Sequence, residues 1–374
     1  MSVTNIPESV KFRLWGKAAG RCQYESCGRQ LYLDSLTKVE FNTAYIAHIY
    51  GEMPGSARYE KGTSERLAKD ISNLMLMCDE HHRKIDVHEK DQHPAPRLIQ
   101  MKQDNERRIE LLTSLMPSQQ THLILFGANI GTHQTPLTFN DASLALLPDR
   151  FPSENHAIEL GITNGTLENH QPEYWDFHQQ QLVRMFERRV EPLKGADKVQ
   201  HYSIFAMAPM PLLIKLGSLI SDIYPADVYQ RHREPASWQW QSGDRGEQMR
   251  LIEPADFEGI PVLNLSLSAT VTPDRIEQVL GSKVSIWTIT HQEPNNDFLK
   301  TKRLLADFRI LMRQAFDRIK ATHGQNKQLH IFPAMPIATA IELGRIRQPK
   351  ADMQLVIYDQ NNKLKSFIKT IEIE

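Results

Sequence analysis

The sequence is poor in cysteine, in long apolar runs and in net charge, and each shortage excludes a class of protein. Three cysteines in 374 residues cannot form the disulfide framework that small secreted domains need. Apolar runs such as residues 209–213 are far too short to cross a bilayer. Residues 1–13 contain no apolar segment of the signal-peptide kind. We therefore expect a cytoplasmic protein with no membrane partner.

The near-neutral charge gives no sign of a nucleic-acid partner. The formal net charge is −1, and residues 1–120 contain almost equal numbers of basic and acidic side chains. Any contact with DNA must therefore come from a local patch of basic residues. The hydrophobic content of 40% and the charged content of 24% are ordinary for a globular chain, and the length predicts two or three domains.

All three cysteines lie in the first quarter of the chain. Cys22 and Cys27 form one pair, and Cys78 stands three residues before His81. The C-x-x-H spacing lets a short turn offer two ligands to one metal ion, and the first pair can supply the other two. Such a set is typical of a closed, tetrahedral zinc site that stabilises a small domain. The alternative is that the cysteines are ordinary buried residues and that His81 lies on the surface.

Three further polar residues stand beside these ligands without a structural task. They are His48, Asn73 and His82. Together with the zinc ligands, their order resembles that of an HNH endonuclease of the ββα-metal fold, over about residues 12–110. The motifs that carry the resemblance are Ala18-Ala19-Gly20-Arg21-Cys22, Cys27-Gly28, Ala47-His48-Ile49, Asn73-Leu74, Cys78, His81-His82-Arg83 and Ile85-Asp86.

The resemblance implies a role for each of the three residues. His48 would be the general base that activates water, and Asn73 would orient that base and its loop. His82 would bind a divalent cation, usually Mg²⁺, that stabilises the scissile phosphate. The chemistry agrees, because a neutral imidazole suits proton abstraction near pH 7.

One position departs from the family pattern. Many members carry an acidic metal ligand just before the first histidine, where this chain has Ala47. Asp70 or Asp86 could take its place in the shell of the catalytic metal. Arg58, in the intervening loop, could hold a phosphate or be an ordinary solvated side chain.

The pattern of the chain predicts a domain boundary near residue 117. Residues 7–20 and 97–115 are predicted to be helices, residues 31–50 strand-like, and residues 51–69 a loop. The HNH resemblance implies that the predicted first domain, residues 1–117, is a ββα-metal module with a connecting helix. Residues 118–374 alternate strands and helices, which indicates parallel α/β units.

An internal repeat divides the second domain. The segments 201–209 and 328–336 match, with Phe205 and Phe332 at the same offset of 127 residues as Gly217 and Gly344. Each copy predicts a strand, a proline-containing turn and a helix that ends at the glycine. We expect two related halves, about 118–258 and 259–374, with a pseudo-twofold axis that brings the proline turns together.

The repeat resembles a SAVED domain, a fusion of two CARF-like, Rossmann-like α/β units. Joined to an HNH domain, it looks like the effector nuclease of cyclic-oligonucleotide-based anti-phage signalling (CBASS). The resemblance implies that a cyclic di- or trinucleotide binds the SAVED domain and promotes a homo-oligomer, a dimer or a tetramer. The assembled HNH domain would then degrade double-stranded DNA.

The candidate ligand contacts lie at the carboxyl ends of the strands, where open α/β sheets bind their ligands. Helix N-termini there offer N–H groups to phosphates, and aromatic and basic side chains suit stacked bases. The alternative is that the methionines, the phenylalanines and at least one tryptophan simply pack in the core. The candidates are Pro209, Met210, Lys215, Tyr229, Arg231, Trp238, Trp240, Ser266, Ser268, Thr270, Pro333, Met335 and Pro336.

Two other functions remain open from the sequence. One is a restriction-type HNH nuclease whose second domain reads modified DNA. The other is a non-catalytic zinc module in a ligand-responsive DNA-binding regulator. The His48, Asn73 and His82 set argues against the regulator, because a pure DNA binder has no need of it.

Overall fold

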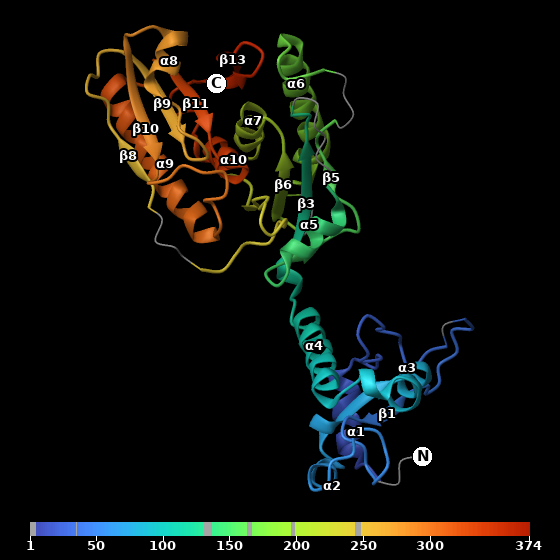
Figure 1. Ribbon diagram of the computed structural model, residues 1–374. Coiled ribbons are helices and arrows are strands. Elements are labelled where there is room, and N and C mark those ends of the chain that lie inside the picture. The colour runs from blue at the N-terminus through green and yellow to red at the C-terminus, as the bar shows by residue number, and fades with distance from the viewer. Residues whose placement is uncertain (1–4, 35, 131–136, 163–166, 196–198, 244–247) are drawn as a thin grey trace. The chain divides into compact units, whose positions relative to one another are not determined.

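The computed structural model describes residues 5–34, 36–130, 137–162, 167–195, 199–243 and 248–374 (Figure 1). The chain divides into two compact units, Met1–Leu115 and Met116–Glu374. Among the described residues, no helix is long and apolar enough to span a membrane.

The first unit is built on one short antiparallel hairpin followed by helical turns. Strand β1 (Tyr45–His48) pairs with β2 (Leu74–Met77) so that His48 lies opposite Leu74. All of β2 is buried, and it forms the centre of a small apolar core. The remaining elements are α1 (Glu8–Lys17), α2 (Thr63–Leu67), η1 (Ile71–Asn73), α3 (Asp79–Arg83), the π-helical turn η2 (Lys84–His88), η3 (Lys90–Gln92) and α4 (Ala95–Thr113).

The two helices predicted for this unit are confirmed as α1 and α4, and two other secondary-structure predictions are wrong. Of the segment 31–50, only β1 forms a regular strand, and an isolated bridge joins Leu33 to Glu40. The predicted loop 51–69 contains the short helix α2. A polar segment of this kind gives no periodic apolar signal by which a helix of five residues could be recognised.

The second unit contains two sheets. The first has the order β4-β3-β6-β7, with β5 also pairing β3, and the second has the order β13-β12-β11-β9-β10-β8. The strands of the first sheet are β3 (Gln120–Gly127), β4 (Phe151–Pro152), β5 (Ile158–Glu159), β6 (Tyr202–Met207) and β7 (Ala226–Val228). Those of the second are β8 (Arg250–Ile252), β9 (Ile260–Ser266), β10 (Val284–Thr290), β11 (Leu329–Ala334), β12 (Leu355–Asn361) and β13 (Ser366–Ile373). The helices are α5 (Phe139–Leu146), α6 (Pro172–Arg189), α7 (Met210–Ile220), α8 (Pro273–Leu280), α9 (Lys302–His323) and α10 (Ile337–Ile346). The unit also contains two 3-10 turns, η4 (Pro117–Gln119) and η5 (Glu191–Leu193).

The predicted duplication is confirmed by the order of these elements. The series β3, α6, β6, α7, β7 recurs as β9, α9, β11, α10, β12, and the strands of each series lie parallel and adjacent. The packing repeats as well, because Phe205 stacks on Tyr229 at 4.3 Å and Phe332 stacks on Tyr358 at 4.4 Å. Strand β8, which precedes β9, pairs with β10 and so extends the second sheet.

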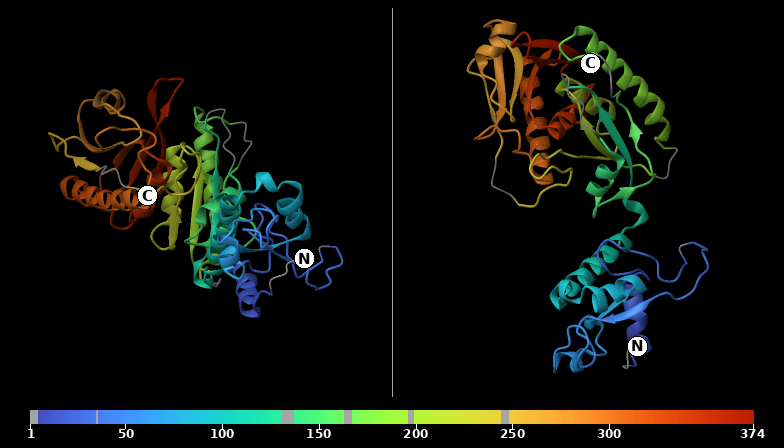
Figure 2. Two further views of the ribbon diagram at one scale, coloured as in Figure 1. Left: turned by 60° about the horizontal axis from the view of Figure 1, so that its bottom comes forward. Right: turned by 45° about the vertical axis from the view of Figure 1, so that its right-hand side comes forward.

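The two halves meet through α7 and α10, which lie side by side between the sheets (Figure 1 and Figure 2). Gly217 and Gly344 were predicted to end these helices, but the helices continue to Ile220 and Ile346. The glycines instead mark the crossing. A Cβ on Gly217 would stand 1.9 Å from the carbonyl oxygen of Ile341, and a Cβ on Gly344 would stand 2.0 Å from that of Ile214. These reciprocal contacts are the predicted pseudo-twofold axis.

Replacing Gly344 by alanine is expected to destabilise the second unit by about 3 kcal/mol or more, because backbone must move to admit the methyl group. The gain in helix propensity, about 1 kcal/mol, offsets only part of this cost. Chemical denaturation measures the change. Gly16→Ala is the control, since an added Cβ there meets nothing within 4 Å in the described structure. Equal midpoints for Gly344→Ala and the wild type would contradict this account of the crossing.

Candidate functional site

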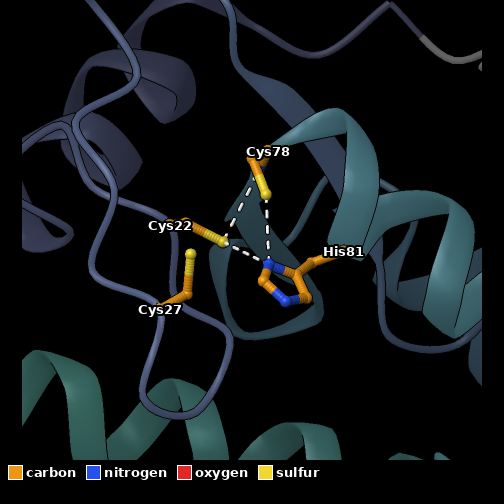
Figure 3. Close-up of side chains that lie close together, drawn as sticks. All are labelled: Cys22, Cys27, Cys78 and His81. Carbon is orange, nitrogen blue, oxygen red and sulfur yellow. Dashed lines mark hydrogen bonds between the residues drawn. The ribbon is translucent and has the colours of Figure 1, made fainter. Parts of the chain in front are cut away.

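The four predicted zinc ligands converge in the first unit. Cys78 lies between β2 and α3, and the first turn of α3 carries His81. Cys22 and Cys27 come from the segment after α1 (Figure 3). Their ligand atoms all lie within 4.8 Å of one another. The Nδ1 of His81 lies 3.1 Å from Sγ of Cys78 and 3.8 Å from Sγ of Cys22. Donors around a tetrahedral zinc lie about 3.5 Å apart, so the group fits that ion.

The surroundings of the group favour a bound cation. Burial raises the pKa of the Cys22 and Cys78 thiols, so a cation is needed to hold them as thiolates. The His81 ring stacks on Tyr24 with 4.1 Å between ring centroids, which keeps Nδ1 turned toward the sulfurs. Three thiolates and one imidazole are a usual donor set for structural zinc.

His48 is held in one tautomer at the end of β1. Its side chain is buried, and Nε2 lies 2.9 Å from the carbonyl oxygen of Ala68. A carbonyl only accepts hydrogen bonds, so Nε2 carries the proton. No described residue bonds Nδ1, which leaves its lone pair to accept a proton.

Asn73 bonds the backbone that follows His48 and the backbone that precedes Ala68. Its Oδ1 accepts from the N–H of Tyr50 at 2.7 Å, and its Nδ2 donates to the carbonyls of Tyr50 and Leu67 at 3.2 and 3.3 Å. Leu67 immediately precedes Ala68, the partner of His48. Asn73 therefore joins the segment that follows His48 to the segment that orients its ring.

His82 and Asp86 form a pair on the helical side of this site. Asp86 lies one turn beyond His82, with 3.4 Å between Oδ2 and Nε2. The His82 ring stacks on Tyr45 of β1 with 5.1 Å between centroids. Asp70 lies elsewhere in the loop: its carboxylate accepts from the backbone and side chain of Ser72, and these bonds lower its pKa. Of the two acidic candidates, Asp86 is the one beside His82.

The set of possible metal ligands at His82 is small. Ala47 is buried in the hairpin, paired with Met75, and offers no donor. Throughout the described ranges, the cysteine–histidine group is the only place where three or more His, Cys, Asp or Glu ligand atoms gather. A cation at His82 and Asp86 would therefore take its remaining ligands from water and substrate phosphate, as Mg²⁺ commonly does.

The proline turns of the second unit are only partly open to a ligand. Pro209 and Pro336 precede α7 and α10 as predicted, but Pro333 lies inside β11 and Met335 is buried. The side chain of Gln230 accepts from the N–H of Ala338 at 3.1 Å. One of the N–H groups predicted to receive a phosphate at α10 is thus already bonded across the two halves.

The aromatic candidates pack instead of lining an open surface. Tyr229 is fully buried against Phe205, and Trp238 meets Phe205 edge-on at 5.3 Å. Trp240 is half-buried against the same cluster, and no strand forms over 238–240. The guanidinium of Arg231 lies over the Trp238 ring at 5.7 Å and is half-buried. Sequence alternation identified these side chains but could not show which face of a sheet they cover.

The remaining candidates divide by exposure. Ser266 is buried and its hydroxyl bonds Asn264 and the N–H of Val271, which is a structural role. Ser268 is half-buried, and Thr270 is exposed. The last two candidates, Lys215 and Met210, are half-buried on α7. Burial lowers the pKa of Lys215, and nearby Arg347 lowers it further.

Residues 182–373 match the family described as "SMODS-associated and fused to various effectors sensor domain", or SAVED. The match covers just over half of the chain. The chain belongs to the SAVED family. No curated protein sequence matches the chain.

Solved receptor structures are similar to this chain at low sequence identity and low TM-score. The Acinetobacter baumannii Cap4 SAVED/CARF-domain receptor with 2′3′3′-cAAA is 12% identical, with a TM-score of 0.42, over 74% of this chain and 56% of that one. The same receptor with 3′3′3′-cAAA is 11% identical, with a TM-score of 0.43, over 74% of this chain and 55% of that one. The Moraxella osloensis Cap4 SAVED/CARF-domain receptor is 11% identical, with a TM-score of 0.37, over 73% of this chain and 54% of that one. The chain thus spans little more than half the length of these receptors.

Sequence patterns did not reveal Asp359, a carboxyl near the carboxyl end of β12 in the SAVED unit. Burial raises its pKa to about 7, although the N–H of Gln360 and the side chain of Asn169 favour the charged form. Asn169 belongs to the other half, and next to it His170 bonds Lys363 at 2.8 Å. The two halves therefore meet around a half-buried carboxyl whose pKa is raised.

The free energy of unfolding of the SAVED unit is expected to depend on this carboxyl. A raised folded-state pKa gives stability that is complete below the ordinary value of 3.8 and is lost as the pH rises to about 7. The loss amounts to about 4 kcal/mol at most. Denaturation of the wild type and of Asp359→Asn between pH 4 and 8 measures the free energy of unfolding at each pH. The variant should lack the loss of stability with rising pH that Asp359 causes in the wild type. Parallel curves would contradict the prediction.

Proposed function

We propose that the chain is a metal-dependent DNA endonuclease that a cyclic oligonucleotide switches on. The observation that carries the proposal is the placement of His48. Its ring is held in one tautomer by Ala68, its backbone is anchored by Asn73, and its strand is in contact with His82 through Tyr45. A general base, its positioning residue and a ligand pair for a cation thus occupy the same hairpin-and-helix unit.

In this proposal His48 acts through Nδ1. The Nε2 proton is held by the carbonyl of Ala68, so Nδ1 is the atom that takes a proton from the attacking water. Asn73 holds the backbone of Tyr50, two residues after His48. This limits rotation of the His48 ring away from the orientation set by Ala68.

His82 and Asp86 are the residues that would hold the catalytic cation. A bound Mg²⁺ supplies charge stabilisation to the scissile phosphate and the leaving oxygen. Asp86 keeps its second oxygen directed at His82 and thereby orients that ring. The Cys22, Cys27, Cys78 and His81 group would hold a structural zinc that keeps β2 and α3 in place.

The SAVED unit supplies the switch in this proposal. The family is described as a sensor domain fused to various effectors, and its resemblance to cyclic-oligonucleotide sensors suggests the ligand class. Among the polar candidates, Lys215, Arg231 and Ser268 are half-buried and Thr270 is exposed. A ligand can switch the enzyme only if it binds the active assembly more tightly than the idle one. We infer a ligand-promoted dimer or tetramer as that assembly.

Calorimetric titration of the whole chain with cyclic di- and trinucleotides tests the sensor. The cyclic trinucleotides found with the Acinetobacter receptor are the first probes. We expect at least one cyclic compound to bind at about micromolar affinity or better, and its linear form much more weakly. No binding by any compound, together with cleavage of modified DNA alone, would favour a restriction-type nuclease. Mass measurements with and without the ligand test assembly, and activation at unchanged mass would refute it.

A further inference from the structure

Arg58 occupies an unusual place in the loop between β1 and α2. Its backbone has φ of 57°, in the left-handed region that side-chain-bearing residues rarely adopt. Its side chain is only 7% exposed. Neither sequence interpretation, a phosphate contact or a solvated loop residue, agrees with this burial.

The guanidinium of Arg58 bonds both sides of the candidate catalytic site. Toward β1, Nε donates to the carbonyl of Ile49 at 2.7 Å and Nη2 to that of His48 at 3.3 Å. Toward η2, Nη1 donates to the carbonyl of Ile85 at 2.7 Å and Nη2 to Oδ1 of Asp86 at 2.5 Å. One planar group therefore ties the end of the histidine strand to the turn that follows His82.

The two oxygens of Asp86 have separate partners. Oδ1 accepts from Arg58, and Oδ2 faces Nε2 of His82 at 3.4 Å. Because the charge of Asp86 is paired by a buried guanidinium, the carboxylate is fixed in orientation as well as in position. The chain of contacts runs from the His48 carbonyl through Arg58 and Asp86 to the His82 ring.

We propose that Arg58 is a positioning residue that sets the distance and orientation of His82 and Asp86 relative to the His48 strand. This inference rests on the proposed nuclease function. All four bonds depend on a rigid, planar fork with several donors, which a lysine ammonium at the same place cannot reproduce. Misplacement of reacting groups by about 1 Å can cost about 100-fold in rate.

Arg58→Lys in the whole, zinc-loaded chain tests the inference. With activator and Mg²⁺, we expect kcat for plasmid cleavage to fall about 100-fold. KM for DNA and zinc content should change little, and the Mg²⁺ concentration for half-maximal rate should rise about 10-fold. Arg66→Lys is the matched control, because Arg66 is an exposed arginine in the neighbouring α2. The control should behave as the wild type.

Three results would overturn the inference. One such result is a rise in KM at constant kcat, together with a smaller slope of DNA affinity against salt concentration, by the amount expected for about one phosphate contact. Arg58 would then contact DNA. If zinc or the fold of the first unit were lost, its role would be general stability. Full activity in Arg58→Lys would show that the fork is not needed.

A second measurement separates this inference from the proposed function. If the wild type cuts no DNA under any condition, the nuclease proposal fails, and binding of Mn²⁺ to the zinc-loaded chain decides the matter. We then expect Arg58→Lys to bind Mn²⁺ about 10-fold more weakly than the wild type. Equal affinities, or no Mn²⁺ binding by the wild type, would overturn the positioning role.

Discussion

Replacing His48 by alanine is expected to lower the rate of DNA cleavage by about 10²- to 10⁴-fold, the contribution of a general base. No other imidazole stands in the same relation to Ala68 and Asn73 among the described residues, so no neighbour replaces the lost Nδ1. The fold should survive, because the truncation removes one hydrogen bond and leaves the β1–β2 pairing intact. Single-turnover cleavage of supercoiled plasmid measures the rate.

The control for this prediction is His88→Ala. His88 lies in η2, close in sequence to His82, but its side chain is exposed. We expect this variant to cut at the wild-type rate, and both variants to keep their zinc. Cleavage by His48→Ala at the rate of His88→Ala would contradict the assignment of the general base.

Removing the zinc is expected to unfold the first unit and leave the second unit folded. The first unit has a small core around one hairpin of two four-residue strands. A structural zinc contributes about 10 kcal/mol or more at pH 7, which is comparable to the whole stability of a small domain. Cys78→Ser should therefore lose both the ion and the fold, since Cys78 links β2 to α3 and is buried.

Zinc analysis and limited proteolysis measure this outcome together. The wild type should bind one zinc per chain, and Cys78→Ser none. Protease should then degrade residues of the first unit while the second unit, which has its own core, remains intact as an internal control. A zinc-free wild type that stays folded would contradict the structural role of the four ligands.

The parts of the structure that sequence could predict are those with local or repeated signals. The C-x-x-H spacing places Cys78 and His81 on one turn whatever the rest of the fold does. The constant offset between Phe205 and Phe332 revealed the duplication, because two copies of one unit must repeat their buried positions. The resemblance to HNH endonucleases pointed to Asn73, and the structure shows the bonds that Asn73 makes.

The parts that sequence could not predict depend on contacts between distant segments. A glycine near the end of a helix suggests a cap, yet Gly344 is there because the backbone of α7 approaches it. Arg58 appeared to be an ordinary loop residue, since nothing local shows that four acceptors converge on it, two at the end of β1 and two in η2. Tyr229 and Trp238 have the chemistry of a ligand platform, but only the packing against Phe205 shows that they are core.

The most direct test of the account is a single plasmid-cleavage experiment on the whole chain with Mg²⁺. Unmodified supercoiled DNA is incubated with and without the cyclic oligonucleotide that binds best, for the wild type and His48→Ala. The account predicts degradation only by the wild type and only with the ligand. Cleavage that is equally fast without the ligand, or intact plasmid with every cyclic di- and trinucleotide, would contradict it.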